Sequence, residues 1–124
     1  DHQVYDSGES REKIAVKMVS LDDYLRGEKD GIGFVKIDVQ GYECHVFSGM
    51  KKTIARSKEM FMISELSPYC LKKAGASAEL YLSEVKRAGF NVEVLSKVEI
   101  NDYSSYAENK WFYTDFAAEK TDLV

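Results

Sequence analysis

Two charged residues stand where a parallel sheet would bind a ligand. Lys36 and Asp38 belong to residues 34–39, an apolar stretch that predicts a buried strand, and both side chains point to the same face. Asp38 stands at the carboxyl end of that strand, where such sheets bind ligands. Burying these charges costs free energy unless they are paired or used. If the two residues are used in a reaction, Lys36 would keep Asp38 ionised or lower the pKa of a nearby hydroxyl. Alternatively, Asp38 caps the following helix or only pairs with Lys36.

Two further acids follow the same edge of the predicted sheet. Glu65 closes the apolar run of residues 60–64, which predicts a second buried strand. Because carboxyl ends of parallel strands meet, Glu65 and Asp38 converge on one pocket. Glu43 opens a helix, where the helix dipole stabilises an acid, so its role is either structural or catalytic. Gly41 serves the tight turn between strand and helix.

Other reactive side chains do not form a recognisable site. His45 follows Cys44 directly, and adjacent helix residues point in different directions, so we expect no bound metal. The aromatic residues near the end of the chain alternate as a core strand does. The net charge of −4 and the pI of about 5.2 argue against nucleic acid and anionic membranes as partners.

The elements that position these residues alternate between strand and helix. Strands are expected over residues 14–19, 34–39, 60–64, 91–95 and 111–116. Helices are expected over residues 21–27, 43–57 and 78–88, and loops over residues 67–69 and 101–109. The order predicts an α/β fold with parallel strands, in which the last two strands form an antiparallel unit.

Length and composition are those of one ordinary globular domain. The chain has 124 residues, of which 44% are hydrophobic and 31% charged, and we expect a single domain over residues 1–124 with residues 1–12 flexible. No apolar run approaches the roughly 20 residues that span a bilayer. Cys44 and Cys70 are expected to be reduced thiols of a cytoplasmic protein.

Four motifs occur in order along the chain. They are Val19-Ser20-Leu21-Asp22-Asp23-Tyr24-Leu25, Val35-Lys36-Ile37-Asp38-Val39-Gln40-Gly41-Tyr42-Glu43, Val46-Phe47-Ser48-Gly49-Met50 and Ile63-Ser64-Glu65. Together they resemble the later half of an FkbM-type methyltransferase. The resemblance covers residues 16–90 and, more loosely, extends to residue 116. The family more often has Glu at the position of Gln40.

This resemblance implies a fold and an activity. The fold would be part of the class I S-adenosylmethionine-dependent methyltransferase fold: a partial Rossmann-like three-layer sandwich with a mostly parallel sheet and an antiparallel final strand. Residues 34–39 would form its fourth strand, residues 60–64 its fifth, and residues 111–116 would insert antiparallel beside the fifth. The activity would be methyl transfer to a hydroxyl of a sugar or secondary metabolite. Asp38 would lie beside the transferred methyl group and, with Val39 and Gln40, at the cofactor; Lys36, Glu43 and Glu65 are the other catalytic candidates.

One part of the family pattern is missing. The family's cofactor site begins with a glycine-rich turn after the first strand and an acid after the second. Gly31 and Gly33 precede a strand instead of following one, and Gly8 has no strand before it. We therefore expect the C-terminal, substrate-side portion of a methyltransferase domain, which binds the cofactor weakly or not at all alone.

The alternative is a catalytically inactive, truncated domain that acts in assembly. The edge of the strand over residues 34–39 would be open in such a portion, and open apolar edges pair with other strands. We expect either a homodimer at this edge or pairing with residues 14–19.

Overall fold

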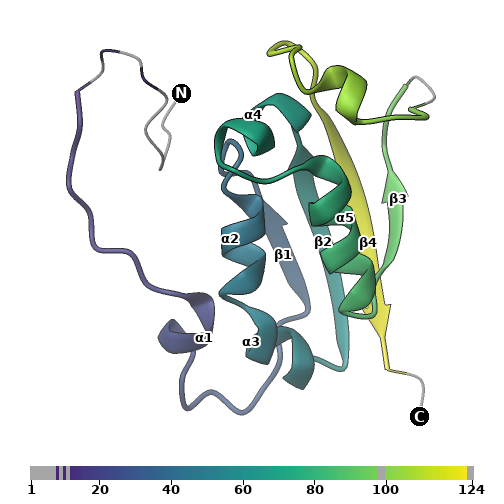
Figure 1. Ribbon diagram of the computed structural model, residues 1–124. Helices are drawn as coiled ribbons and strands as arrows, with labels where there is room; N and C mark the ends of the chain where they lie inside the picture. The colour runs from purple at the N-terminus through teal and green to yellow at the C-terminus, as the bar shows by residue number, and fades with distance from the viewer. Residues whose placement is uncertain (1–7, 9, 11, 98–99, 123–124) are drawn as a thin grey trace.

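The computed structural model describes residues 8, 10, 12–97 and 100–122 of the chain (Figure 1). The elements in chain order are α1 (Leu21–Tyr24), β1 (Phe34–Ile37), α2 (Glu43–Ser48), α3 (Lys51–Arg56), β2 (Glu59–Leu66), α4 (Pro68–Lys73), α5 (Ala78–Arg87), β3 (Asn91–Val94), the 3₁₀ turn η1 (Ser104–Tyr106) and β4 (Thr114–Thr121). The expected α/β class is confirmed.

The four strands form one sheet in the order β1-β2-β4-β3. β1 pairs parallel with β2, and β4 pairs antiparallel with both β2 and β3. Three strands thus run in one direction, and the last strand of the chain lies between two of them in the opposite direction. This confirms the prediction that the final strand inserts antiparallel beside the strand ending near Glu65.

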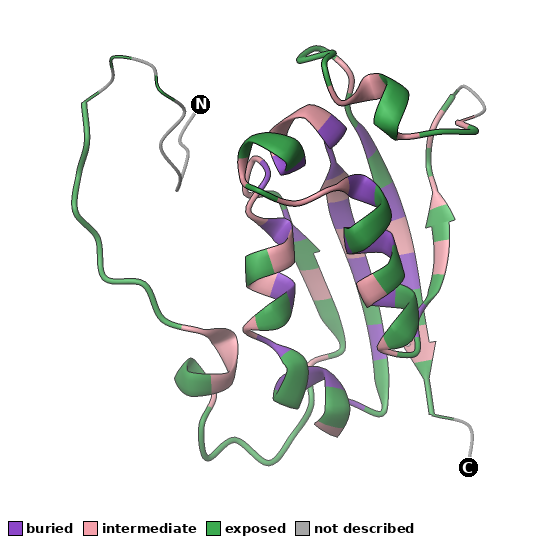
Figure 2. Cartoon of the chain, viewed as in Figure 1, coloured by how far each residue is buried: buried purple, intermediate pink, exposed green. Residues whose placement is uncertain are grey.

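Helices α2, α4 and α5 lie on the same face of the sheet (Figure 1). Their buried sides face the strands, as the burial colouring of Figure 2 shows. On the opposite face, the rings of Phe34 and Phe61 stack with centroids 6.0 Å apart, yet they remain 57% and 41% exposed. The described residues therefore form two layers, and the third layer of the expected sandwich is not among them.

The core lies between the sheet and these helices. Alternate residues of β2 are buried and face the helices, among them Met62 and Ser64. The hydroxyl groups of Ser64 and Tyr81 are 2.9 Å apart, so the polar groups buried here are hydrogen-bonded to each other. Tyr81 also meets Phe116 of β4 edge to face, with ring centroids 5.4 Å apart. This packing joins α5 to the central strands.

The helix expected over residues 43–57 is two helices. α2 and α3 are separated at Gly49 and Met50, because a segment from α1 docks there. The amide of Asp22 donates to the carbonyl of Gly49, and the Asp22 carboxylate accepts from the amides of Lys52 and Thr53 and from the Thr53 hydroxyl. Asp22 thus caps α3 from another part of the chain, which local sequence spacing does not reveal.

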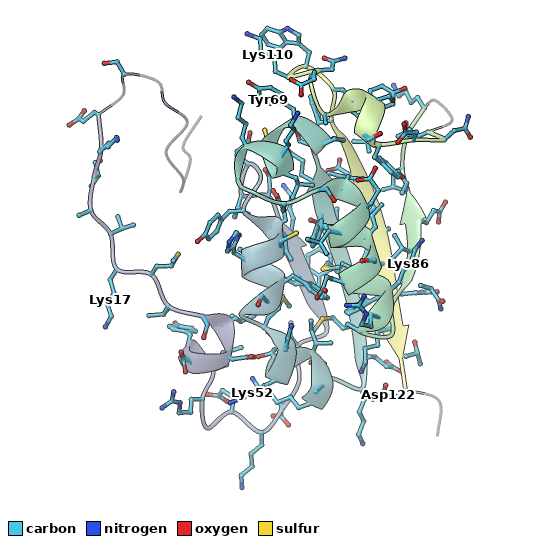
Figure 3. The ribbon with its side chains drawn as sticks, in the orientation of Figure 1. Lys17, Lys52, Tyr69, Lys86, Lys110 and Asp122 are labelled. Atoms are coloured by element: carbon cyan, nitrogen blue, oxygen red, sulfur yellow. The ribbon has the colours of Figure 1, made fainter. Side chains whose placement is uncertain are left out.

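The strand expected over residues 14–19 is not formed, and that prediction is wrong. These residues are exposed and make no ladder, and in Figure 3 the segment that carries Lys17 lies away from the sheet. Alternating hydrophobicity alone does not make a strand when no neighbouring strand pairs with it. Residues 14–19 therefore do not pair with the edge of β1. Pairing of this edge with a second copy of the chain stays a prediction. The expected flexibility of residues 1–12 falls mostly outside the described residues.

Two further boundaries were predicted wrongly near the end of the sheet. The loop expected over residues 67–69 begins α4, because the Ser67 side chain accepts from the amide of Cys70 and Pro68 occupies the first turn. The last strand begins at Thr114, since the aromatic residues before it build a loop in which Tyr106 and Phe112 stack with centroids 3.9 Å apart.

We expect Asp22→Ala to lower the free energy of unfolding by about 2 kcal/mol, because three donors on α3 lose their acceptor. Burial alone would raise the pKa of Asp22, but the hydrogen bonds from Lys52 and Thr53 outweigh it and hold the pKa below the ordinary 3.8. The stabilisation is therefore present above pH 3.8 and lost as the pH falls through the lower folded pKa.

Urea denaturation near neutral pH and well below pH 3.8 measures this effect. The matched control is Asp23→Ala, since the Asp23 side chain hydrogen-bonds only to Ser20 and Arg26 of its own segment among the described residues. Equal losses for the two variants near neutral pH would contradict the capping of α3 by Asp22.

Candidate active site

The site begins with the turn that joins β1 to α2. Gln40 and Gly41 both have positive φ angles, of 54° and 102°. A Cβ atom on Gly41 would lie 2.3 Å from the carbonyl oxygen of Cys70 in α4. Gly41 is therefore needed both for its backbone conformation and for the close approach of α4, which confirms the structural role expected for it.

Glu43 holds this turn from inside. The side chain is 1% exposed, and its Oε1 atom accepts from the amides of Val39, at 3.2 Å, and Gly41, at 3.1 Å. It is also the first residue of α2, where the helix dipole favours a negative charge. These contacts describe a structural role, and a catalytic role for Glu43 stays a prediction.

The structure brings the two other acids together through a side-chain amide. Nε2 of Gln40 donates to Oδ1 of Asp38, at 3.2 Å, and to Oε2 of Glu65, at 3.3 Å. The Nζ atom of Lys36 lies 3.7 Å from the other oxygen of Asp38, Oδ2. Both partners of that ion pair are partly in solvent, with side chains 65% and 43% exposed. Asp38 is thus accessible, and it is held from two sides.

Glu65 carries the altered acidity of this cluster. The pKa of Glu65 is raised from 4.5 to about 7, first of all by burial and then by a hydrogen bond with Asp38. The negative charges of Asp38, Glu43 and Asp115 act in the same direction. A carboxyl group with a pKa near 7 takes up and releases protons at neutral pH, as acid–base catalysis requires.

A groove of about 710 Å³ runs along the open side of β1. Its walls come from residues 18–24, from β1 and from α2, and they are largely apolar. Asp38, Lys36 and Val39 line it, whereas Gln40 does not and faces the acids instead. The volume is in the range of small-molecule and cofactor sites.

Two further residues line this groove: Tyr42, which the sequence pattern did not single out, and His45, which it offered only as a metal ligand. Tyr42 and His45 stack with ring centroids 4.0 Å apart and planes inclined by 7°. Their spacing of three residues at the start of a helix is the signal that places them side by side. The bridging by Gln40 was also missed, because it depends on the positive φ angle of that residue. Within the described ranges, no three His, Cys, Asp or Glu residues are grouped so as to hold a metal ion.

Comparison with known families matches the Methyltransferase FkbM domain over residues 1–92 of this chain. The matched range includes β1, β2 and all six of the predicted site residues, which are Lys36, Asp38, Val39, Gln40, Glu43 and Glu65. Neither curated proteins nor solved structures gave a match. For the part of the chain that the structure describes, none of the helices has the length and apolar character needed to span a bilayer.

Proposed function

Since the chain belongs to the FkbM methyltransferase domain family, we propose that it is the substrate-side part of an S-adenosylmethionine-dependent O-methyltransferase. The acceptor is a hydroxyl of a sugar or secondary metabolite. The observation that carries this proposal is the cluster of Asp38, Gln40 and Glu65 at the carboxyl ends of two parallel strands, beside a groove of cofactor size. We also propose that the whole domain has the third layer of the family fold. A cytoplasmic location is part of the same proposal, because it suits the free thiols of Cys44 and Cys70.

Asp38 is the base in this proposal. Transfer to a hydroxyl needs an aligned oxygen and a group that takes its proton. The Asp38 carboxylate is accessible from the groove, Gln40 donates to its Oδ1, and the Lys36 ammonium lies 3.7 Å from its Oδ2. Glu65 accepts a hydrogen bond from Gln40. Because its pKa is raised to about 7, it is protonated for part of the time at neutral pH, which limits the negative charge of the cluster.

The groove fits the reacting end of the cofactor. Bound S-adenosylmethionine supplies an activated methyl group on a positively charged sulfur. Asp38 and Val39 would lie beside that end, since a carboxylate stabilises a positive charge and the surrounding walls are apolar. Gly31 and Gly33 precede β1, and the described residues contain no strand before it, so the glycine-rich turn of the family pattern is not among them.

The proposal is tested by methyl transfer with the protein as its source organism makes it. With S-adenosylmethionine labelled on the methyl group and a panel of sugars and small hydroxyl compounds, we expect label on a hydroxyl oxygen. In calorimetry, the 124-residue chain alone should bind the cofactor no more tightly than about 1 mM. Label found only on nitrogen or carbon would refute O-methylation. Micromolar binding by the chain alone would show that the missing turn is not needed.

A second candidate is an inactive domain that acts in assembly. It is favoured by the open edge of β1 and by the exposed ring pair of Phe34 and Phe61 beside it. We expect a homodimer in light scattering, weakened by Phe34→Glu because the charge would face the second copy. Trp111→Glu is the matched control, since Trp111 is also an exposed aromatic residue but lies in the loop before β4. A wild-type protein that stays monomeric over the concentrations measured would exclude this assembly.

A further inference from the structure

Gln40 has a backbone conformation that is uncommon for its residue type. Its φ angle of 54° lies in the left-handed region, which costs free energy for any residue with a Cβ atom. The amides on both sides of it, those of Val39 and Gly41, donate to the buried Oε1 of Glu43. Glu43 thus fixes the turn around Gln40, and the left-handed conformation is imposed by the surrounding structure.

The side chain of Gln40 uses this conformation to reach two carboxylates. The Nε2 atom has two hydrogens, and the two acceptors are Asp38, which follows β1, and Glu65, on β2. Hydrogen bonds from a neutral amide favour the ionised form of each acid without adding a charge. A glutamate at this position would remove the donor and place another negative charge beside the pair.

We propose that Gln40 is a positioning residue, whose amide bridges the carboxyl groups of Asp38 and Glu65 and keeps Glu65 ionised to a lower pH than it would be without this hydrogen bond. This inference rests on the proposed function, in which Asp38 receives the proton of the acceptor hydroxyl. In this proposal the left-handed turn joins β1 to α2 and also directs the Gln40 amide to the two carboxyl groups. Asp38 touches the substrate in this scheme, whereas Gln40 acts through Asp38 and Glu65.

Charged groups from several elements surround the pair. Asp115 of β4 is the register partner of Glu65 in the sheet, and Glu43 of α2 lies behind the turn. Both are negative and favour protonation of Glu65, whereas Lys36 of β1, 3.7 Å from Asp38, adds a positive charge that opposes it. Without the Gln40 amide, the balance moves toward the protonated form. The titration midpoint of Glu65 should therefore rise.

Carbon-13 NMR of the side-chain carboxyls measures that midpoint in the 124-residue chain, with Glu65→Gln to assign the signal. In Gln40→Gly, we expect the midpoint to rise by about one pH unit, with a melting temperature equal to or above that of the wild type. Glycine adopts the left-handed backbone freely, so this variant keeps the turn and removes only the amide. In Gln40→Glu, the midpoint should rise further. Asn91→Ala, which removes an exposed amide from β3, should leave it unchanged.

Methyl transfer by the protein as its source organism makes it supplies a second readout. Gln40→Gly should lower kcat about tenfold, move the pH optimum upward and leave KM close to that of the wild type. An unchanged Glu65 midpoint in both Gln40 variants would overturn the inference. If the wild-type protein transfers no methyl group, the proposed function fails, and the NMR titration still decides the role of Gln40.

Discussion

Asp38→Asn is expected to lower kcat for methyl transfer about 100-fold or more. The asparagine side chain has the same shape, and its Oδ1 can still accept from Gln40, so the turn should remain intact. It cannot take a proton from the acceptor hydroxyl, however, and it loses the charge that pairs with Lys36. The measurement is kcat and KM with the labelled cofactor, together with the melting temperature of the variant.

The control for this experiment is Asp122→Asn. Asp122 lies at the opposite end of the molecule from Tyr69 and Lys110, as Figure 3 shows, and it pairs with Lys120 outside the site. Its replacement should leave kcat unchanged. Turnover of Asp38→Asn at the wild-type rate would remove Asp38 from the mechanism. A raised KM with an unchanged kcat would limit Asp38 to binding the acceptor.

Gly41→Ala is expected to lower the free energy of unfolding by about 3 kcal/mol or more. The φ angle of 102° is unfavourable for alanine, and the new Cβ would lie 2.3 Å and 2.5 Å from the carbonyl oxygen and carbon of Cys70. Both are backbone atoms of α4, so relief requires the helix to move away from the turn. Urea denaturation of the wild type and the variant measures the loss.

Gly75→Ala is the matched control for this loss. Gly75 also has a positive φ angle, of 82°, but a Cβ atom there would meet nothing within 4 Å. Its replacement should cost about 1 kcal/mol, which is the backbone cost alone. The difference between the two variants is then the cost of separating α4 from the turn. Equal losses would show that α4 does not need its close contact with Gly41.

The meeting of Asp38 and Glu65 could be predicted from sequence. Each acid follows a short apolar run, and the ends of parallel strands fall at one edge of a sheet. The bridge between them could not be predicted, because it requires Gln40 to adopt a left-handed conformation. That conformation is fixed by Glu43, whose Oε1 atom accepts from the amides of Val39 and Gly41 in the same turn.

Other errors arose where distant contacts decide the local structure. The division between α2 and α3 depends on Asp22, which is about 30 residues away and supplies the cap of α3. In β4, Ala117 and Ala118 give little strand signal, but pairing on both sides makes these residues a strand. The aromatic residues before β4 have the stronger strand propensity, yet they remain in the loop because no ladder position is available to them.

The central position of β4 determines when this sheet can be completed during synthesis. The ribosome makes β4 after the other three strands of this sheet, yet β4 separates β2 from β3 and is the strand to which β3 pairs. Leu66 pairs with Thr114, which is made 48 residues later, so this edge of β2 stays unpaired until β4 has emerged. Nascent chains that stop before residue 114 therefore expose the edges of both β2 and β3, where they are open to chaperones and to aggregation.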